Sequence, residues 1–291
     1  MRSRYLPIAG LLLLGAGEAL AQQSPPQVLM ITREQFKPGN MAAHNKEIPA
    51  FYALFEKAGV GASRLGLLPF SGDQNHLLYV EAYPSYAAME TTSTRMDDVF
   101  AGSAGLQKEM DTLTKRSDSL HDSQSVMIAV RRNELSYRPL AVDAVAKSRF
   151  VNLTVTRVNP GRGPEYADYL KQTNAAREKA GLDEHSTVWS VTSGAQAGTF
   201  LVFTFNRSLG ESDALRTGMD ARSQKLNEAL GGEAIVKQRQ KLYSEIVAQS
   251  TTTLYAFNRG ISRPSPEFVA ADPAFWKSSQ KQLAQLEPAK K

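Results

Sequence analysis

The sequence contains no cysteine among its 291 residues. This absence excludes disulfide bonds, thiolate nucleophiles and Cys-ligated metal sites. A chain of this length has room for two ordinary domains, and 42% of its residues are hydrophobic. We therefore expect its stability to come from hydrophobic burial alone.

The sequence also lacks the short motifs of several enzyme classes. It has no G-x-S-x-G, no G-x-x-x-x-G-K-[ST], no G-x-G-x-x-G after a strand, and no H-x-x-x-H or D-x-D spacing. Hydrolase, P-loop and Rossmann functions are therefore not expected, and neither a metal nor a cofactor is predicted. The 34 Lys and Arg residues are scattered among 29 acids without a basic stripe, so no nucleic-acid partner is expected.

The first residues have the pattern of a secretory signal peptide. Arg2 and Arg4 precede the apolar run 8–14, and Ala19 and Ala21 supply the small residues before a cleavage point. The apolar run is too short for a membrane-spanning helix, which needs roughly 20 residues. We predict a signal peptide over 1–21, cleavage after Ala21, a periplasmic or secreted mature protein, and no stable membrane insertion.

The two halves of the chain share landmarks at a constant offset of 122 residues. Pro-Gly, Glu-Lys-Ala-Gly and Ser-Gly turns recur at this offset, and the apolar run 78–80 falls on 200–202. By the ends of the halves the offset has grown to 125, where Arg138-Pro139 corresponds to Arg263-Pro264. This self-similarity predicts an internal duplication.

Within each half the hydrophobic periods predict the order β-α-β-β-α-β, which is that of a ferredoxin-like module. We therefore expect an α+β fold in which two tandem modules pack sheet to sheet as an intrachain dimeric α+β barrel. The predicted divisions are a first module over 22–139, a linker over 140–148, a second module over 149–264 and a tail over 265–291. In the tail, Asp272-Pro273 can begin a short amphipathic helix with Phe275, Trp276, Leu283 and Leu286 on its apolar face.

Several residues resemble the NIPSNAP-type module. They are Phe36-Lys37-Pro38-Gly39, the helix with an internal Pro49 and a glycine after it, and the strand 78–83 ahead of Ser85-Tyr86. The wider superfamily is the dimeric α+β barrel, which includes cofactor-free monooxygenases and haem-dependent chlorite dismutase-like proteins. The chain departs from the pattern at Thr32 and Thr154, where such proteins often carry Arg.

Strand alternation predicts which side chains point between the two sheets. Apolar Leu29, Ile31, Leu153 and Val155 on the first strands, and Leu78, Val80, Phe200 and Val202 on the third, are expected to face the helices. The opposite, inward face then carries Met30, Thr32, Glu34, Asn152, Thr154, Thr156, Tyr79, Glu81, Tyr83, Leu201, Phe203 and Phe205.

Candidate site residues follow from this inward face. Glu34 and Glu81, if enclosed, could act as general acid or base, and Arg33, Arg64 or Arg131 could instead pair with them. The predicted ligand-binding residues are Tyr79, Tyr83, His44, Asn152, Thr154 and Phe203. His44 lies on the apolar stripe of its helix, where the repeat places Tyr166, and this favours a packing residue with a polar tip.

Three functions remain open. The first is an exported module that binds a small, mostly apolar ligand between its sheets. The second is a cofactor-independent oxygenase or isomerase, with Glu34 or Glu81 as base and Tyr79, Tyr83 or Asn152 orienting the substrate. The third is haem binding through His44. The oligomeric state can be a monomer or a homodimer, because duplication can supply the sheet contact within one chain.

Overall fold

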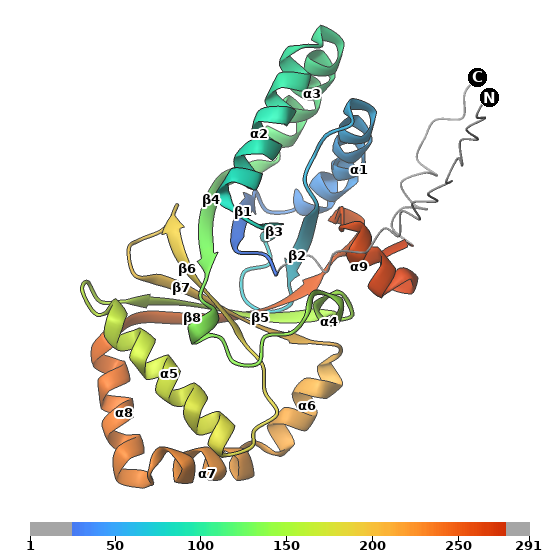
Figure 1. The fold of residues 1–291 in the computed structure, drawn as a ribbon. Coiled ribbons are helices and arrows are strands. Elements are labelled where there is room, and N and C mark those ends of the chain that lie inside the picture. Colours follow the sequence, from blue (N-terminus) through green and yellow to red (C-terminus); the bar gives the residue numbers. More distant parts are fainter. Residues whose placement is uncertain (1–24, 278–291) are drawn as a thin grey trace, which may run out of the picture.

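The computed structural model describes residues 25–277, and the predicted signal peptide, Leu283 and Leu286 lie outside this range. Eight strands and nine labelled α-helices lie in the described part, and residues 273–277 are helical as well (Figure 1). The strands are β1 (Val28–Phe36), β2 (Arg64–Pro69), β3 (His76–Tyr83), β4 (His121–Arg131), β5 (Phe150–Val158), β6 (Thr187–Ser193), β7 (Thr199–Asn206) and β8 (Val247–Phe257). The helices are α1 (Met41–Ala58), α2 (Tyr86–Ala101), α3 (Ala104–Asp118), α4 (Val142–Ala146), α5 (Gly163–Lys179), α6 (Leu209–Thr217), α7 (Met219–Leu230), α8 (Glu233–Ile246) and α9 (Pro266–Ala271).

The strands form one closed antiparallel barrel in the order β1-β3-β2-β8-β5-β7-β6-β4. The predicted mixed α+β class is therefore confirmed. Each half of the chain contributes four strands, and the two sets are hydrogen-bonded to each other where β2 pairs with β8 and β4 pairs with β6. The halves are thus joined edge to edge into one sheet. The duplication itself stays a prediction.

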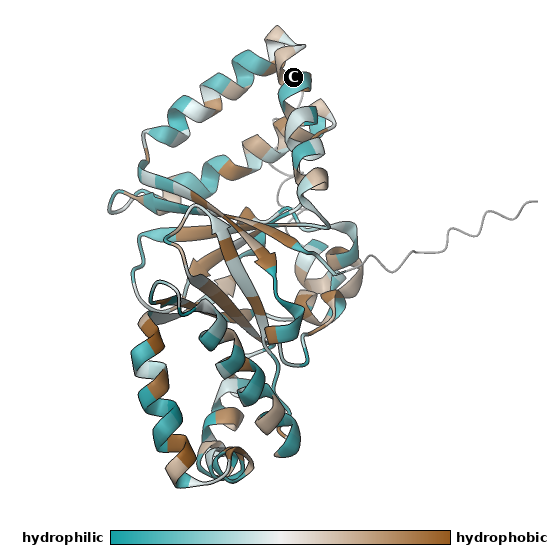
Figure 2. Ribbon diagram, turned by 60° about the vertical axis from the view of Figure 1, so that its left-hand side comes forward, coloured by the Kyte–Doolittle hydropathy of each residue, from teal (hydrophilic) through white to brown (hydrophobic). Residues whose placement is uncertain are grey.

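Hydrophobic side chains fill the interior of the barrel. One buried cluster draws residues from all eight strands, which is possible only inside a closed barrel. Its strand members include Leu29, Ile31, Leu67, Leu78, Ala129, Val151, Leu153, Trp189, Leu201, Phe203, Tyr255 and Phe257. In Figure 2 hydrophobic segments recur along the strands of the barrel between paler and hydrophilic ones, while the helices carry long hydrophilic stretches.

This interior corrects the predicted direction of many strand side chains. On β1, β3 and β5 the expected faces are reversed: Leu29, Ile31, Leu78, Val80, Leu153 and Val155 point into the barrel. Met30, Thr32, Glu34, Tyr79, Glu81, Tyr83, Asn152, Thr154 and Thr156 therefore lie on the outer face. Only on β7 is the prediction right, with Leu201, Phe203 and Phe205 inside and Phe200 and Val202 against a helix.

A one-residue slip contributes to the error on β3. The pair Ile31–Val80 in the first half takes the place of Leu153–Phe203 in the second, so the offset is 122 on the first strand and 123 on the third. The extra residue lies in the β6–β7 connection. If the offset of 122 residues is applied beyond this hairpin, Tyr79 is matched with Leu201 and the two side chains are expected on the same face. In the structure they lie on opposite faces.

Helices cover the outside of the barrel on two opposite sides, α1–α3 on one and α5–α8 on the other (Figure 1). Helix α1 ends as predicted at Gly59, whose φ of 65° is left-handed, and it continues through Pro49. Its inner face packs on β1 and β3 through Ile48 and Tyr52. Among the described residues, none of the helices is both long and apolar enough to cross a membrane.

Each half sends a short 3-10 turn beneath the first helix of the other half. The turn at Arg259–Ile261 follows β8, and its Ile261 carbonyl accepts a hydrogen bond of 2.7 Å from the Tyr52 hydroxyl of α1. The turn at Asn133–Leu135 follows β4, and its Leu135 carbonyl accepts one of 2.8 Å from Asn174 of α5. These crossed contacts tie the halves together beyond the shared barrel.

The described part of the tail closes one end of the barrel. Asp272 caps the turn before Trp276, as predicted, by accepting a hydrogen bond from the Phe275 backbone. Trp276 is fully buried in the barrel cluster, and its indole N–H donates to the Ala146 carbonyl at 2.8 Å. Ala146 belongs to α4, a short helix within the predicted linker. An ion pair between Arg149 and Asp272 holds the same turn.

Candidate functional site

A buried polar cluster lies beneath α1 on the outer face of the first half. Glu34 of β1 is 5% exposed and His44 of α1 is 1% exposed. His121, the first residue of β4, reaches the same place from the strand beside β1. The Nε2 atoms of His44 and His121 both lie 3.2 Å from Glu34 Oε2. Two histidines, one from α1 and one from β4, thus converge on one oxygen of a carboxylate on β1.

The pKa values of the two histidines are shifted in opposite directions. Burial lowers the pKa of His44 to about 4, against an opposing contribution from Glu34. The hydrogen bond from His121 to Glu34 raises the pKa of His121, although partial burial acts the other way. At neutral pH the His44 imidazole is therefore neutral, and any positive charge in the cluster lies on His121.

Further contacts hold the cluster in place. Gln124 Nε2 donates to Glu34 Oε1 at 3.1 Å, so both carboxylate oxygens have partners. The Tyr79 hydroxyl lies 3.2 Å from His44 Nε2, while His44 Nδ1 is buried without a hydrogen-bond partner in the described structure. Phe36 packs against the rings of both histidines. The cluster is therefore closely packed.

A second buried carboxylate, Glu81 of β3, forms a separate cluster. Arg64 Nε donates to its Oε1 at 2.7 Å, and the Tyr83 hydroxyl donates to its Oε2 at 2.5 Å. Glu81 is opposite Met30 and Glu34 is opposite Leu77, so four residues, or about 13 Å, separate the two acids along the strands. Tyr79 links the two clusters, because the Arg64 guanidinium stacks 4.8 Å from the centre of its ring while its hydroxyl faces His44.

In the second half the corresponding place under the helices is hollow. A cavity of about 440 Å³ lies between the outer face of β5 and β7 and the helices α6 and α7. In the first half the cross-strand pair is Met30–Glu81, and Glu81 binds the Arg64 and Tyr83 side chains. The corresponding pair in the second half, Asn152–Thr204, carries smaller groups. The lining residues are Asn152, Leu182, Glu184, Thr204, Asn206, Ser212, Leu215, Arg216, Met219, Arg222, Ser223 and Leu226.

The floor of this cavity is polar and unpaired. Asn152, Thr204 and Asn206 project from the sheet, and their side chains have no hydrogen-bond partner within residues 25–277. Asn206 is only 3% exposed. Polar groups of this kind on the floor of a mostly apolar pocket can bond to the polar head of a ligand.

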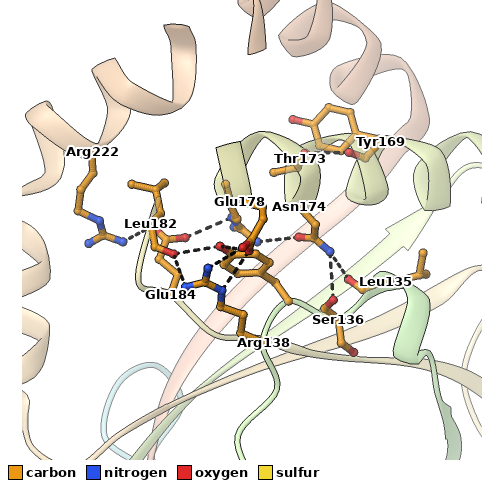
Figure 3. A network of polar contacts seen from close by, with 12 residues as sticks. Leu135, Ser136, Arg138, Tyr169, Thr173, Asn174, Glu178, Leu182, Glu184 and Arg222 are labelled. Carbon is orange, nitrogen blue, oxygen red and sulfur yellow. Dashed lines mark hydrogen bonds and ion pairs between the residues drawn. The ribbon is translucent and has the colours of Figure 1, made fainter. Parts of the chain in front are cut away.

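One wall of the cavity belongs to a polar network around the end of α5 (Figure 3). Glu184 forms an ion pair with Arg222 of α7 and another of 3.2 Å with Arg177 of α5. Arg138, after β4, forms a further pair of 2.8 Å with Glu178. These bridges fix the α7 side of the cavity relative to α5. A larger groove of about 750 Å³ between α5, α7 and α8 contains none of the predicted site residues.

The structure distributes the predicted site residues over several places. Glu34, His44 and Tyr79 lie in the first cluster, while Glu81 and Tyr83 lie in the second. Asn152 lines the cavity. Thr154 hydrogen-bonds Thr252 at 2.7 Å on the outer face, and Phe203 belongs to the barrel core. The space between the sheets, where the ligand was predicted, is thus the filled core.

Sequence reasoning missed His121, Gln124 and Asn206. His121 and Gln124 are 87 and 90 residues from Glu34 in the chain, and only the β1–β4 pairing brings them together. A search for metal ligands at close spacing could not find them. The available signal was the position of His121 just before a predicted strand that lies next to the first strand in a ferredoxin-like order.

No protein-family model and no curated protein matches this chain. Solved structures of similar shape include an anthrone oxidase-like protein (11% identity, 81% of this chain and 93% of that one, TM-score 0.49). A proposed monooxygenase from Fusobacterium nucleatum has 12% identity, 80% and 93% coverage and a TM-score of 0.46. A mutant chlorite dismutase from Candidatus Nitrospira defluvii has 9% identity, 88% and 98% coverage and a TM-score of 0.45. Likeness of this degree assigns no reaction.

Proposed function

We propose that this protein is exported and binds a small amphipathic molecule in the cavity between β5–β7 and α6–α7. One observation carries the proposal: three unpartnered polar side chains, Asn152, Thr204 and Asn206, form the floor of a cavity of about 440 Å³. This volume falls within the usual range for ligand pockets, which are mostly apolar with a few placed polar groups.

The walls indicate the chemistry of the ligand. Leu182, Leu215, Met219 and Leu226 offer apolar contact, and Leu215 and Met219 are 38% and 54% exposed in the free protein. Covering them would remove apolar surface from water, which is favourable by roughly 25 cal/mol per Å². The ligand we propose therefore has an apolar body and a hydrogen-bonding head directed at the sheet.

The enzyme alternative, with Glu34 or Glu81 as general base, has less support. Neither acid lines either of the two cavities described above. Both are already engaged, Glu34 by His44, His121 and Gln124 and Glu81 by Arg64 and Tyr83. Haem ligation by His44 would need room for a porphyrin beside its Nε2, but Glu34 Oε2 and the Tyr79 hydroxyl each lie 3.2 Å from that nitrogen.

The proposal can be tested with 8-anilinonaphthalene-1-sulfonate, a probe with apolar rings and one polar head. We expect saturable binding with one equivalent per folded chain. Ser223→Trp, which fills the cavity from α7, should weaken binding at least tenfold, and Asn206→Leu should weaken it by removing a polar partner. Lys225→Trp on the same helix, outside the cavity lining, is the matched control and should bind as the unchanged protein does.

Equal binding by Ser223→Trp and Lys225→Trp would refute this site, provided that circular dichroism shows both variants folded. If the site is supported, mass spectrometry of the protein purified from its source under native conditions would identify the natural ligand. Export is tested separately by expressing the full chain and locating it by cell fractionation. A processed protein beginning at Gln22 outside the cytoplasm is the expected outcome.

A further inference from the structure

We propose that Glu34, His44 and His121 bind one divalent first-row transition metal ion. This site is separate from the cavity, since the three residues lie beneath α1 in the other half of the chain. Their candidate ligand atoms are Glu34 Oε2, His44 Nε2 and His121 Nε2, and all three lie within 4.8 Å of one another.

The spacing of these atoms fits a metal ion. Zinc–nitrogen and zinc–oxygen bonds are about 2.0–2.2 Å, so two ligands of a tetrahedral ion lie about 3.3 Å apart. Glu34 Oε2 lies 3.2 Å from each of the two histidine nitrogens. Two edges of the coordination polyhedron are therefore already at length, and the third, between the two histidine nitrogens, is no longer than 4.8 Å.

The contacts of Glu34 also favour a cation between these residues. In the described part of the chain neither Lys nor Arg forms an ion pair with Glu34, and its ionic partners are the two histidines alone. His44 Nε2 faces both Glu34 Oε2 and the Tyr79 hydroxyl, but a neutral ring nitrogen can donate one proton or accept one, not both. A metal ion accepts the lone pairs of all three ligands at once.

Supporting contacts orient two of the three ligands, Glu34 and His121, as in known metal sites, whereas His44 is held by packing because its Nδ1 has no hydrogen-bond partner in the described structure. Ligating carboxylates and imidazoles are usually held through their second polar atom. Gln124 donates to the other oxygen of Glu34, and His121 has a hydrogen bond to the Ser117 backbone. His44 is held between the helix and Phe36, with ring centres 4.7 Å apart.

The donor set restricts the metal. Two imidazoles and one carboxylate suit zinc, cobalt, nickel or ferrous iron, whereas calcium and magnesium prefer oxygen ligands throughout. Three protein ligands leave one coordination position open in a tetrahedral ion, and the Tyr79 hydroxyl lies close by, 3.2 Å from His44 Nε2. Of the three ligands, His121 has the most exposed side chain, at 13%.

Cobalt(II) is a suitable probe because its visible spectrum reports its ligands. Protein prepared without a polyhistidine tag and stripped with a chelator should bind one equivalent of Co²⁺, which one equivalent of Zn²⁺ displaces. Glu34→Gln and His121→Gln should each weaken binding at least 100-fold. Gln124→Leu should weaken it about 10- to 100-fold through loss of orientation.

His185→Gln provides the control, since His185 lies in the second half and bonds the Phe205 backbone. It should bind Co²⁺ like the unchanged protein. His121 is at a partly exposed strand end, so His121→Gln is the variant that should fold even if Glu34→Gln does not. Absence of stoichiometric Co²⁺ in the folded unchanged protein, or equal affinity in His121→Gln and His185→Gln, would overturn the proposal.

Discussion

The side chain of Ile261 lies directly in front of Gly66, so that a β-carbon added at Gly66 would be 2.5 Å from Ile261 Cγ1. The two residues come from opposite halves of the chain. Gly66 N–H also donates to the Ser262 hydroxyl at 2.9 Å. The turn after β8 can therefore approach β2 only because residue 66 has no side chain.

Gly66→Ala should destabilise the protein by about 1–3 kcal/mol, since the added methyl overpacks this contact. The cost should be smaller in an Ile261→Ala background, where the clashing atoms are absent. Urea denaturation of the two single variants and the double variant gives the coupling. Gly105→Ala, with nothing within 4 Å of the new β-carbon, is the control and should not destabilise. If the free-energy changes of the two single variants simply add in the double variant, the Gly66–Ile261 contact is not the cause of the destabilisation.

Trp276→Ala should cost about 3–5 kcal/mol, because a fully buried indole is lost from the end of the barrel. Lys277→Ala, which alters the neighbouring exposed side chain, should change the free energy of unfolding by less than about 0.5 kcal/mol. Chemical denaturation followed by circular dichroism compares them. Similar stabilities for the two variants would mean that the tail does not seal the core.

Arg64→Met should cost about 3–5 kcal/mol by leaving the Glu81 carboxylate buried without its counter-charge. The double variant Arg64→Met/Glu81→Gln should recover part of this loss, since a neutral amide needs no ionic partner. The exposed pair Lys57–Glu109 offers a comparison, and Lys57→Met/Glu109→Gln should cost no more than about 1 kcal/mol. A double variant less stable than Arg64→Met would contradict this account.

The Tyr166 phenol should make the protein less stable in alkali. Burial raises its pKa to about 12, despite a hydrogen bond with Thr156 that lowers it. Because the folded pKa exceeds the ordinary value of about 10, the stabilising contribution is complete below pH 10 and is lost as pH rises towards 12. At pH 11 the loss from this group is about 1.4 kcal/mol.

Unfolding free energies at pH 8 and pH 11 measure this effect. Tyr166→Phe should lose less stability between the two pH values than the unchanged protein, by about 1.4 kcal/mol. An equal loss in both proteins would show that Tyr166 ionises without penalty. The ultraviolet absorbance of the phenolate gives an independent reading of the same titration.

Turns and helices were predictable from the sequence because their signals are local. Gly59 at the end of α1 and Asp272 before the last described turn act within a few residues of themselves. The directions of strand side chains were not predictable from the sequence. Helices cover the outer face of the barrel, so residues such as Thr32 and Glu34 on that face are buried just as residues of the inner face are. Thr32 and Glu34 are as buried as Leu29, so burial alone could not tell the faces apart.

The candidate sites depended on the same distinction. Glu34, His44 and Tyr79 were selected as candidate site residues, and the structure brings them together in the space under α1 and not between two sheets. His121 could not be predicted as a site residue, because it is 87 residues from Glu34 in the sequence and only strand pairing brings the two together. The cavity depends on the small side chains at Asn152 and Thr204. A cavity of this kind leaves no recognisable pattern in a sequence.

Closure of the barrel has a consequence for behaviour at high concentration. An open sheet exposes unpaired backbone groups on its outermost strands, where another chain can add a strand and begin aggregation. Here every described strand has a neighbour on both sides, and the joins β2–β8 and β4–β6 complete the circuit. The described strands of this disulfide-free protein thus offer no template for cross-β growth while it stays folded.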